Sequence, residues 1–188
     1  MRLSCIMLIL LAPVALQGCF PVIAVGAGSG AMMATDRRTS GTYVEDEAIE
    51  NKALLKIGEQ YKEKVHLNVT SFNRTVLLTG EVPNELVKVE IGKHVAAIDN
   101  VRKVINELGI GEPSTLTSRS NDTLLTSKVK FGFLNNKRFR ATDIKIVTEN
   151  EVVYLLGLVK RAEADAAAES ARTTAGIKKV VRVFEYLD

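Results

Sequence analysis

The chain has 188 residues, of which 46% are hydrophobic, so it is long and apolar enough to bury one ordinary core or two small ones. The net charge of +3 is too small to indicate a nucleic-acid-binding protein by itself. Because only 5% of the residues are aromatic and none is Trp, we expect the cores to consist of Val, Ile, Leu and Ala.

The chain begins with an export signal. Arg2 is followed by an apolar stretch over residues 4–16, which has the length of a signal-peptide core and is short for a membrane span. Residues 16–19, Leu-Gln-Gly-Cys, resemble the bacterial lipobox. The sequence therefore predicts a lipoprotein signal peptide over residues 1–18 and lipidation of Cys19.

Two other interpretations of this segment remain. Residues 3–16 are an uncleaved anchor helix in the first, and an ordinary secretory signal precedes an unmodified cysteine in the second. The lipobox is favoured because the only other cysteine is Cys5 in the leader, which leaves no thiol for a disulfide or for catalysis in the folded part. Phe20, rather than Asp, follows the cysteine, which by analogy favours the outer membrane.

A low-complexity segment follows. Residues 20–44, after the lipidated Cys19, are predicted to form a flexible tether. The Gly-rich run at 26–30 is superficially similar to a phosphate-binding loop. No Gly-Lys-Ser/Thr follows it and no strand precedes it, so we interpret it as part of the tether.

From residue 45 onward the chain repeats itself at an offset of 76 to 77 residues. The matching hydrophobic segments are 66–71, 76–82 and 101–105 in the first copy and 143–148, 153–159 and 177–181 in the second. A repeat of this length predicts two copies of one small domain. We expect domain 1 over residues 45–110, a linker over 111–119 and domain 2 over 120–188.

Each copy is predicted to contain a helix, two strands, a second helix and a last strand. In domain 1 these are a helix over 46–62, two strands with alternating apolar positions joined by a turn at Asn73-Arg74, a helix over 84–98 and a strand over 101–108. The expected fold class is α+β, with a small three-stranded mixed sheet packed against two helices in each domain.

Domain 2 is predicted in the same way. Its helices span residues 122–135, where Asn121 or Asp122 can cap the start, and 161–175, and a last strand spans 177–187. Its hairpin turn lies at residues 149–151.

Four further residues receive structural interpretations. Gly80 and Gly157 are expected to end the second strand of each copy, where the chain leaves the sheet sharply. Glu149 and Glu151 are expected to face solvent at the hairpin.

The pattern Val-x-Leu-x-Gly-x-Val, helix, Asn/Gly-Val/Ile-x-x-Val resembles the BON domain (bacterial osmotically inducible and nodulation proteins). It stands at 76–82 with 100–104, and again at 153–159 with 176–180. Two such domains after a lipobox look like the dual-BON outer-membrane lipoproteins of proteobacteria, the DolP type. The stretches especially similar to that group are 34–37, 120–129 and 148–159.

The resemblance implies an αββαβ fold for each domain and a non-enzymatic role in outer-membrane integrity. It also implies binding of anionic phospholipid by the first helix of the second domain, with localisation to the division site as a further expectation. The protein would face the periplasm as a lipid-anchored protein of the outer membrane.

The residues themselves give no positive indication of an enzyme. His66 and His94 are the only histidines, no His, Cys, Asp or Glu cluster has metal-ligand spacing, and no Ser stands in a Gly-x-Ser-x-Gly context. We therefore predict no catalytic residues, no metal site and no cofactor.

The strongest candidate binding segment is 124–140, which contains five bases and no acid, together with three of the six phenylalanines. On a helical wheel, Leu125, Val129 and Phe133 share a core face, whereas other apolar residues fall outside it. Apolar side chains beside bases suit the surface of an anionic membrane. The predicted phospholipid-binding residues are Leu124, Lys128, Lys130, Phe131, Leu134, Lys137 and Arg138.

Two alternatives stay open. Leu124, Phe131 and Leu134 are apolar enough to pack against domain 1, and we expect the two domains to pack on each other in either case because each is small. At the level of function, the alternative is a periplasmic adaptor for an envelope protein, such as assembly or cell-wall machinery, with incidental lipid contact. Nucleic acid is not an expected partner, because an exported, lipid-anchored protein rarely meets it.

Overall fold

The computed structural model describes residues 37–61 and 64–188, so Cys19, the predicted signal peptide and residues 20–36 of the predicted tether lie outside the described residues. In the described part, no helix is both long and apolar enough to cross a membrane. Residues Asp36–Asp188 form one unit by their internal contacts.

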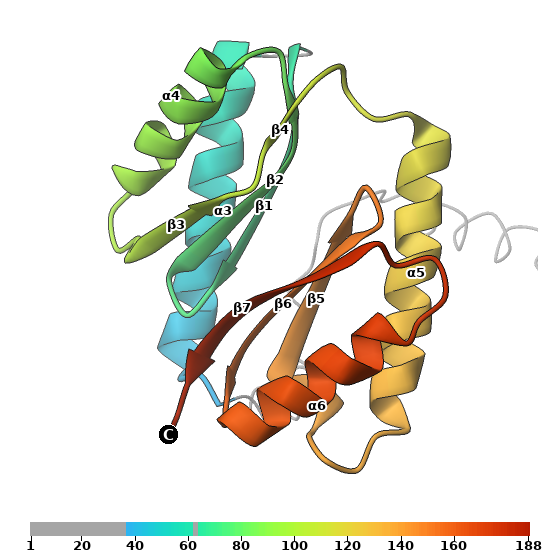
Figure 1. The fold of residues 1–188 in the computed structure, drawn as a ribbon. Helices are drawn as coiled ribbons and strands as arrows, with labels where there is room; N and C mark the ends of the chain where they lie inside the picture. Colours follow the sequence, from blue (N-terminus) through green and yellow to red (C-terminus); the bar gives the residue numbers. More distant parts are fainter. Residues whose placement is uncertain (1–36, 62–63) are drawn as a thin grey trace, which may run out of the picture. The chain divides into compact units, whose positions relative to one another are not determined.

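The described chain contains two successive αββαβ domains, as the sequence predicts (Figure 1). Domain 1 consists of α3 (Ser40–Tyr61), β1 (His66–Phe72), β2 (Thr75–Val82), α4 (Glu85–Ala96), β3 (Lys103–Asn106) and the short β4 (Gly109–Ile110). Domain 2 consists of α5 (Leu116–Leu134), the 3-10 turn η3 (Ala141–Asp143), β5 (Ile144–Glu149), β6 (Val152–Val159), α6 (Arg161–Arg172) and β7 (Lys179–Tyr186).

Both sheets are mixed. In domain 1 the order is β1-β2-β3, with β1 antiparallel and β3 parallel to β2, and in domain 2 the order is β5-β6-β7 with the same directions. The predicted last strand of domain 1 is interrupted after Asn106 and resumes as β4, which also pairs with β2. The sheet of domain 1 therefore has four strands rather than the predicted three.

The central strands are buried on both faces, which explains their nearly continuous apolar runs. In β2, Val76 and Leu78 face the helices of domain 1, whereas Leu77 lies in a second cluster with residues of domain 2. In β6, Val153 and Leu155 face α5 and α6 in the same way. Figure 1 shows helices on the outer side of each sheet, with the two sheets between them.

A buried aspartate in the first helix of each domain holds the hairpin turn. Asp46 accepts hydrogen bonds from the backbone N–H groups of Asn73 and Arg74 at 2.8 and 2.7 Å. All four turn residues of the two hairpins have positive φ angles between 50° and 65°, as a type I′ turn requires, although only the two Asn residues are suited to it. The carboxylate stabilises a turn that Arg74 and its counterpart Glu151 by themselves disfavour.

Two predicted helix starts are wrong. Helix α3 begins at Ser40, so residues 40–44 are helical and not part of a tether. Helix α5 begins at Leu116 after Thr115, whose hydroxyl accepts a hydrogen bond from the N–H of Ser118 at 3.1 Å, so residues 116–119 are not a linker. In the sequence Asp122 resembles a helix cap, but it lies inside α5, and its carboxylate accepts the backbone N–H groups of Asn150 and Glu151 in the hairpin turn.

Gly80 and Gly157 do not end their strands as predicted, because β2 and β6 continue for two more residues. Gly80 has a φ of 116°, and a Cβ there would lie 2.1 Å from the carbonyl oxygen of His66. A Cβ at Gly157 would lie 2.6 Å from the carbonyl oxygen of Asp143. Both glycines therefore permit a close approach of the neighbouring backbone.

Candidate functional site

Helix α5 is held against the sheet of domain 2 by one apolar face. Leu125, Val129 and Phe133 are buried at the spacing of one helical face, which confirms the predicted core face. Phe133 meets Phe139 edge to face, with ring centroids 4.9 Å apart. This packing fixes which side of the helix faces solvent.

The opposite side of α5 exposes apolar residues. Leu124, Phe131 and Leu134 keep 62%, 69% and 72% of their surface accessible. Leu124 and Phe131 are seven residues apart, so they lie about 10 Å apart on one line of the helix, and Leu134 continues it by one turn. We call Leu124, Phe131 and Leu134 the α5 ridge. The ridge does not pack on domain 1, contrary to the alternative that the sequence left open.

Three lysines flank the ridge. Lys128 and Lys130 extend from α5, Lys137 extends from the loop that follows it, and all three are exposed. Within the described part of the chain, the side chains of these three lysines form no hydrogen bond and no ion pair. Their charges are therefore available to an anion.

The arginines of this segment have acidic partners that the sequence did not reveal. Arg138 forms an exposed ion pair with Glu169 of α6 at 2.8 Å, and Arg140 pairs with the buried carboxylate of Asp143 at 2.7 Å. Arg138 was predicted to bind phospholipid. An exposed ion pair of this kind contributes about 0–1 kcal/mol, so Arg138 can exchange its partner for a phosphate at low cost.

A shallow apolar cavity of about 210 Å³ lies beside the ridge, between α5 and β5. Its lining includes Phe133, Leu134, Ile144 and Ile146, with Lys130 as the one charged residue. The cavity extends the apolar surface of the ridge toward the edge of the sheet.

The equivalent helix of domain 1 has the opposite charge. Among the residues of α3 there are five acids and two bases, whereas α5 contains one acid and three bases. Leu55 of α3 is as exposed as Phe131, at 68%. Exposed apolar residues are therefore common to both helices, and only α5 combines them with a net positive charge.

Arg37 connects the end of the predicted tether to domain 2. Its guanidinium donates to both carboxylate oxygens of Glu163 at 2.7 and 2.8 Å and to the carbonyl of Leu158 at 2.9 Å, and it lies 3.0 Å from Asp143. The hydrogen bond from Arg37 lowers the pKa of Glu163 to about 2, against an opposing effect of burial. Arg37 is therefore held on domain 2, although it lies within the predicted tether.

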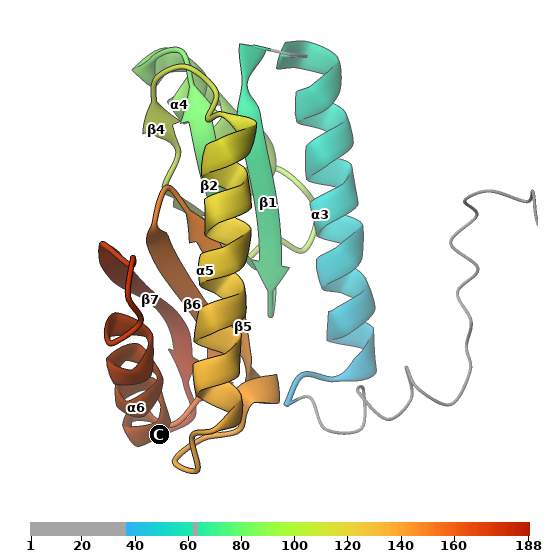
Figure 2. The ribbon, with the colours of Figure 1, turned by 90° about the vertical axis from the view of Figure 1, so that its right-hand side faces the viewer.

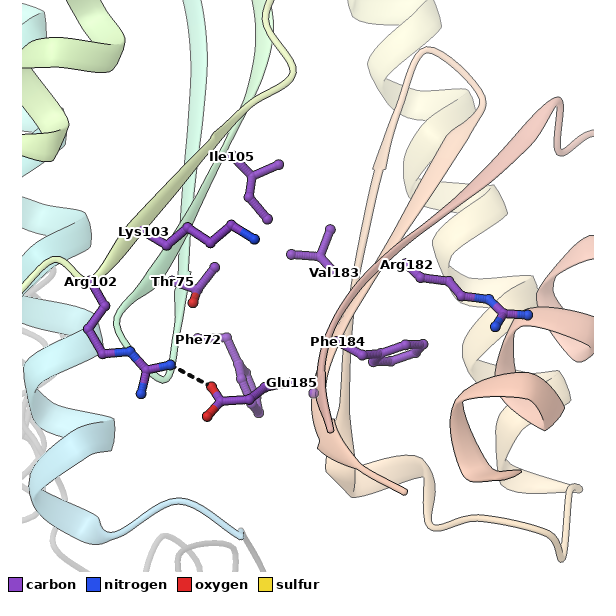
Figure 3. A pocket seen from close by; sticks show the side chains of 10 residues that line it. Phe72, Thr75, Arg102, Lys103, Ile105, Arg182, Val183, Phe184 and Glu185 are labelled. Atoms are coloured by element: carbon purple, nitrogen blue, oxygen red, sulfur yellow. Dashed lines mark hydrogen bonds and ion pairs between the residues drawn. The ribbon is translucent and has the colours of Figure 1, made fainter. Parts of the chain in front are cut away.

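The two domains meet through the sheet faces that carry no helices. Phe72 and Leu77 of domain 1 form one apolar cluster with Tyr154, Leu156 and other residues of domain 2. Burial, followed by nearby acidic charge, raises the pKa of Tyr154 to about 12. Figure 3 shows the open side of this interface, where a cleft of about 210 Å³ is crossed by an ion pair between Arg102 and Glu185 at 2.8 Å.

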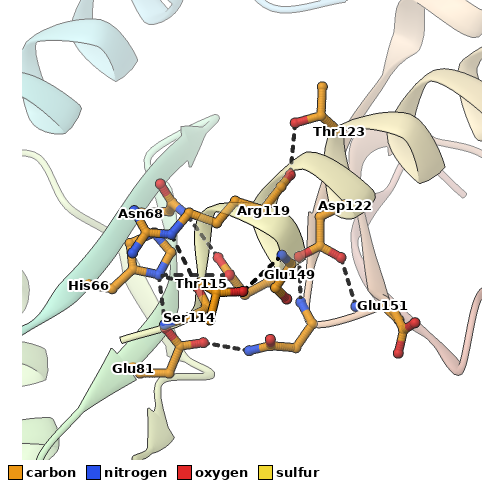
Figure 4. A network of polar contacts seen from close by, with 12 residues as sticks. His66, Asn68, Glu81, Ser114, Thr115, Arg119, Asp122, Thr123, Glu149 and Glu151 are labelled. Carbon is orange, nitrogen blue, oxygen red and sulfur yellow. Dashed lines mark hydrogen bonds and ion pairs between the residues drawn. The ribbon is translucent and has the colours of Figure 1, made fainter. Parts of the chain in front are cut away.

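A polar network closes the other side of the interface (Figure 4). His66 of β1 donates from Nδ1 to Glu81 of β2 at 2.9 Å, and the same nitrogen lies 3.9 Å from Glu149 of β5. Glu149 accepts a hydrogen bond from the side chain of Asn68 at 2.7 Å, and Glu81 accepts one from the backbone N–H of Ser114 at 2.9 Å. The prediction that Glu149 faces solvent is wrong, because Glu149 is buried and its carboxylate contacts Asn68 of domain 1.

The two carboxylates of this network differ in their electrostatics. Burial raises the pKa of Glu149, and the nearby charges of Glu81 and Asp122 raise it further. Burial also acts to raise the pKa of Glu81, but the hydrogen bonds from Ser114, Asn150 and His66 outweigh it and lower the pKa below its ordinary value. Sequence reasoning missed this cluster because its members come from three strands and share no local motif.

The model of the BON domain matches twice, at residues 45–112 and 121–188. The chain is 38% identical over 179 residues to the outer membrane lipoprotein DolP of Haemophilus influenzae, covering 94% of this chain and 93% of the relative.

Two further relatives are more distant. A 21 kDa hemolysin of Actinobacillus pleuropneumoniae is 35% identical over 154 residues, which cover 81% of this chain and 79% of the relative. The osmotically inducible protein Y of Escherichia coli K12 is 25% identical over 144 residues, which cover 74% of this chain and 72% of that protein.

Proposed function

Because the chain belongs to the BON-domain family, and within it to the dual-BON proteins of the DolP type, we propose that it is an outer-membrane lipoprotein that binds anionic phospholipid through α5. In this proposal Cys19 carries the lipid anchor and the two domains face the periplasm. Binding localises the protein at particular membrane regions, the division site among them, and supports envelope integrity.

The observation that carries the proposal is the α5 ridge beside three unpaired lysines. Leu124, Phe131 and Leu134 would enter the headgroup region while Lys128 and Lys130 meet phosphates. A base close to an acidic membrane contributes about 1 kcal/mol, and a large apolar side chain up to about 1.5–3 kcal/mol when it is fully buried. Side chains that enter only the headgroup region gain part of these energies, and the cost of association offsets much of the rest, so the net binding is weak and reversible.

The contact between Arg37 and domain 2 would allow even weak binding to hold α5 on the membrane. Arg37 is held on domain 2 by Glu163 and Asp143, and Asp143 is only nine residues beyond the end of α5. The 17 residues 20–36 span at most about 60 Å even when fully extended, so a lipid on Cys19 would keep domain 2 near the membrane. The resulting high effective concentration compensates for a low intrinsic affinity.

Vesicle co-sedimentation of residues 36–188, which lack the anchor, tests the proposal. We expect salt-sensitive binding to vesicles that contain phosphatidylglycerol and none to purely zwitterionic vesicles. The combined substitution Lys128→Ala, Lys130→Ala and Phe131→Ala is expected to abolish binding with the fold intact by circular dichroism.

Domain 1 supplies a matched control. The combined substitution Lys52→Ala, Leu55→Ala and Lys56→Ala removes the same charge and a similar apolar side chain from the exposed surface of α3. It is expected to leave vesicle binding unchanged. Equal binding by the wild type and the folded α5 variant would refute the assignment to α5, and no binding by the wild type would favour a protein partner instead.

A further inference from the structure

We propose that His66, Glu81 and Glu149 form a binding site for one Zn²⁺ ion that joins domain 1 to domain 2. The candidate ligand atoms are Nδ1 of the histidine and one carboxylate oxygen of each glutamate, and they all lie within 4.8 Å of one another. Imidazole nitrogen and carboxylate oxygen are ordinary zinc ligands. The site is separate from α5 and goes beyond the proposed membrane function.

The distances between the ligand atoms suit a single small ion. Nδ1 of His66 lies 2.9 Å from Oε2 of Glu81 and 3.9 Å from Oε1 of Glu149. Zinc bonds of about 2.0–2.2 Å place the ligand atoms of a tetrahedral site roughly 3.3 Å apart, so shifts of less than about 1 Å would suffice. Binding would replace the proton by which Nδ1 donates to Glu81, and that proton would pass to solvent.

The electrostatics of the cluster favour a cation. The side chains of Glu81 and Glu149 are only 9% and 7% exposed, and the buried Asp122 lines the same cavity as Glu149. Both oxygens of Asp122 already accept backbone hydrogen bonds from the hairpin turn, so it adds negative charge without being a ligand. Neighbouring buried carboxylates repel each other, and a divalent ion between two of them removes that cost.

The ligands are held in place by a second set of contacts. Asn68 donates to Glu149 at 2.7 Å, whereas the backbone N–H of Ser114 and the side chain of Asn150 donate to Glu81. Such partners orient metal ligands and strengthen binding. Figure 4 shows these groups converging from strands of both domains and from the segment that precedes α5.

Access and a fourth coordination position are provided by an adjoining cavity of about 320 Å³, which His66 and Glu149 line. A site with three protein ligands and one water molecule is typical of accessible zinc sites. Mg²⁺ and Ca²⁺ prefer six or more oxygen ligands, so the histidine and the low ligand number favour zinc. Arg119 lines the same cavity and donates from Nε to Ser114, and its charge opposes a cation.

Isothermal titration of the mature lipoprotein in detergent micelles, without an affinity tag, tests the proposal. ZnCl₂ is expected to bind with one Zn²⁺ per chain. Glu149→Gln keeps the shape and the hydrogen bond from Asn68 but removes the charge. Because even the loss of an outer partner costs about 10–100-fold in metal affinity, we expect this variant and His66→Gln each to weaken binding by more than about a hundredfold.

Two matched variants keep the result specific. Glu151→Gln removes a glutamate charge two residues away that pairs with Lys178, and it is expected to leave zinc affinity unchanged. Arg119→Gln is expected to tighten binding, since it removes the opposing charge. The sulfur of Cys19 is present in every variant, so its contribution cancels.

Thermal unfolding supplies the second readout. Zinc at about a hundred times its dissociation constant is expected to raise the Tm of the wild type by about 5–10 °C over that in EDTA, and to leave the Tm of Glu149→Gln unchanged. The proposal is overturned if the wild type shows no saturable zinc binding, or if the two ligand variants bind like the wild type. Loss of binding in Glu149→Gln with full binding in His66→Gln would overturn the three-ligand site as well.

Discussion

Asp46 and Asp122 stand 76 residues apart and perform the same task in the two domains, since each accepts two backbone N–H groups of a hairpin turn with its buried carboxylate. Asp46 also accepts a hydrogen bond from Ser71 at 2.6 Å and pairs with Arg38 at 2.8 Å. The first helix of each domain is thereby fixed to the hairpin that it covers. In domain 2 this contact fixes the rotation of α5 about its axis, and hence the direction of the α5 ridge.

Replacement of these aspartates should be costly. Asp122→Ala leaves two backbone donors without their partner and is expected to lower the free energy of unfolding by about 1–3 kcal/mol. Asp46→Ala also leaves Ser71 and Arg38 without this partner, so a larger loss of about 2–4 kcal/mol is expected. Urea unfolding measures both values, with exposed Ser120→Ala as the control. Equal stability of Asp122→Ala and the control would contradict the role of the carboxylate.

Phe131→Trp provides a probe of membrane contact, because the chain has no other Trp. Its emission is expected to shift to shorter wavelength when phosphatidylglycerol vesicles are added, since the ring would leave water for the headgroup region, and to return as salt screens the lysines. Leu55→Trp, on the equivalent exposed position of α3, should not shift. A shift in the emission of Leu55→Trp alone would show that domain 1 contacts the membrane, and it would contradict the assignment to α5.

Replacement of glycine by alanine is expected to destabilise the protein at Gly80 and Gly157 but to stabilise it at Gly58. Gly80→Ala and Gly157→Ala would place Cβ 2.1 and 2.6 Å from backbone oxygens, so each is expected to destabilise the fold by about 2–4 kcal/mol. Gly58→Ala in α3 meets nothing within 4 Å and should stabilise the helix by about 0.5–1 kcal/mol. Chemical denaturation compares the three. An unchanged free energy of unfolding in Gly80→Ala would contradict the close approach of the two strands as the reason for this glycine.

The contact between Arg37 and Glu163 predicts a dependence of stability on pH. The pKa of Glu163 is lowered from 4.5 to about 2 in the folded protein, so its contribution is complete above about pH 4.5 and is lost as the pH falls toward 2. Arg37→Gln removes the main cause of the shift. Unfolding measured between pH 7 and 2 should show a flatter acid limb for this variant, whereas Arg172→Gln should follow the wild type. Parallel acid limbs for Arg37→Gln and the wild type would disprove the assignment.

Much of the fold follows from local patterns. The alternation of apolar residues around Val76 and Val153 predicts the central strands, and the offset of 76 to 77 residues predicts a repeated domain. The core face of α5 was also predictable, because Leu125 and Val129 recur at helical spacing. Helix starts were not, since Asp122 resembles a cap in the sequence while the partners of its carboxylate lie on the hairpin.

The sequence by itself therefore determined the two αββαβ domains, the family and the candidate segment 124–140, because periodicity and motif depend on neighbours along the chain. Only the tertiary structure decided which basic side chains of that segment are without an acidic partner, since Arg138 pairs with Glu169 of α6. It also decided that His66, Glu81 and Glu149 meet. These three side chains lie on strands of two different sheets, so they become neighbours only when the sheets pack face to face. A local sequence pattern cannot predict that contact.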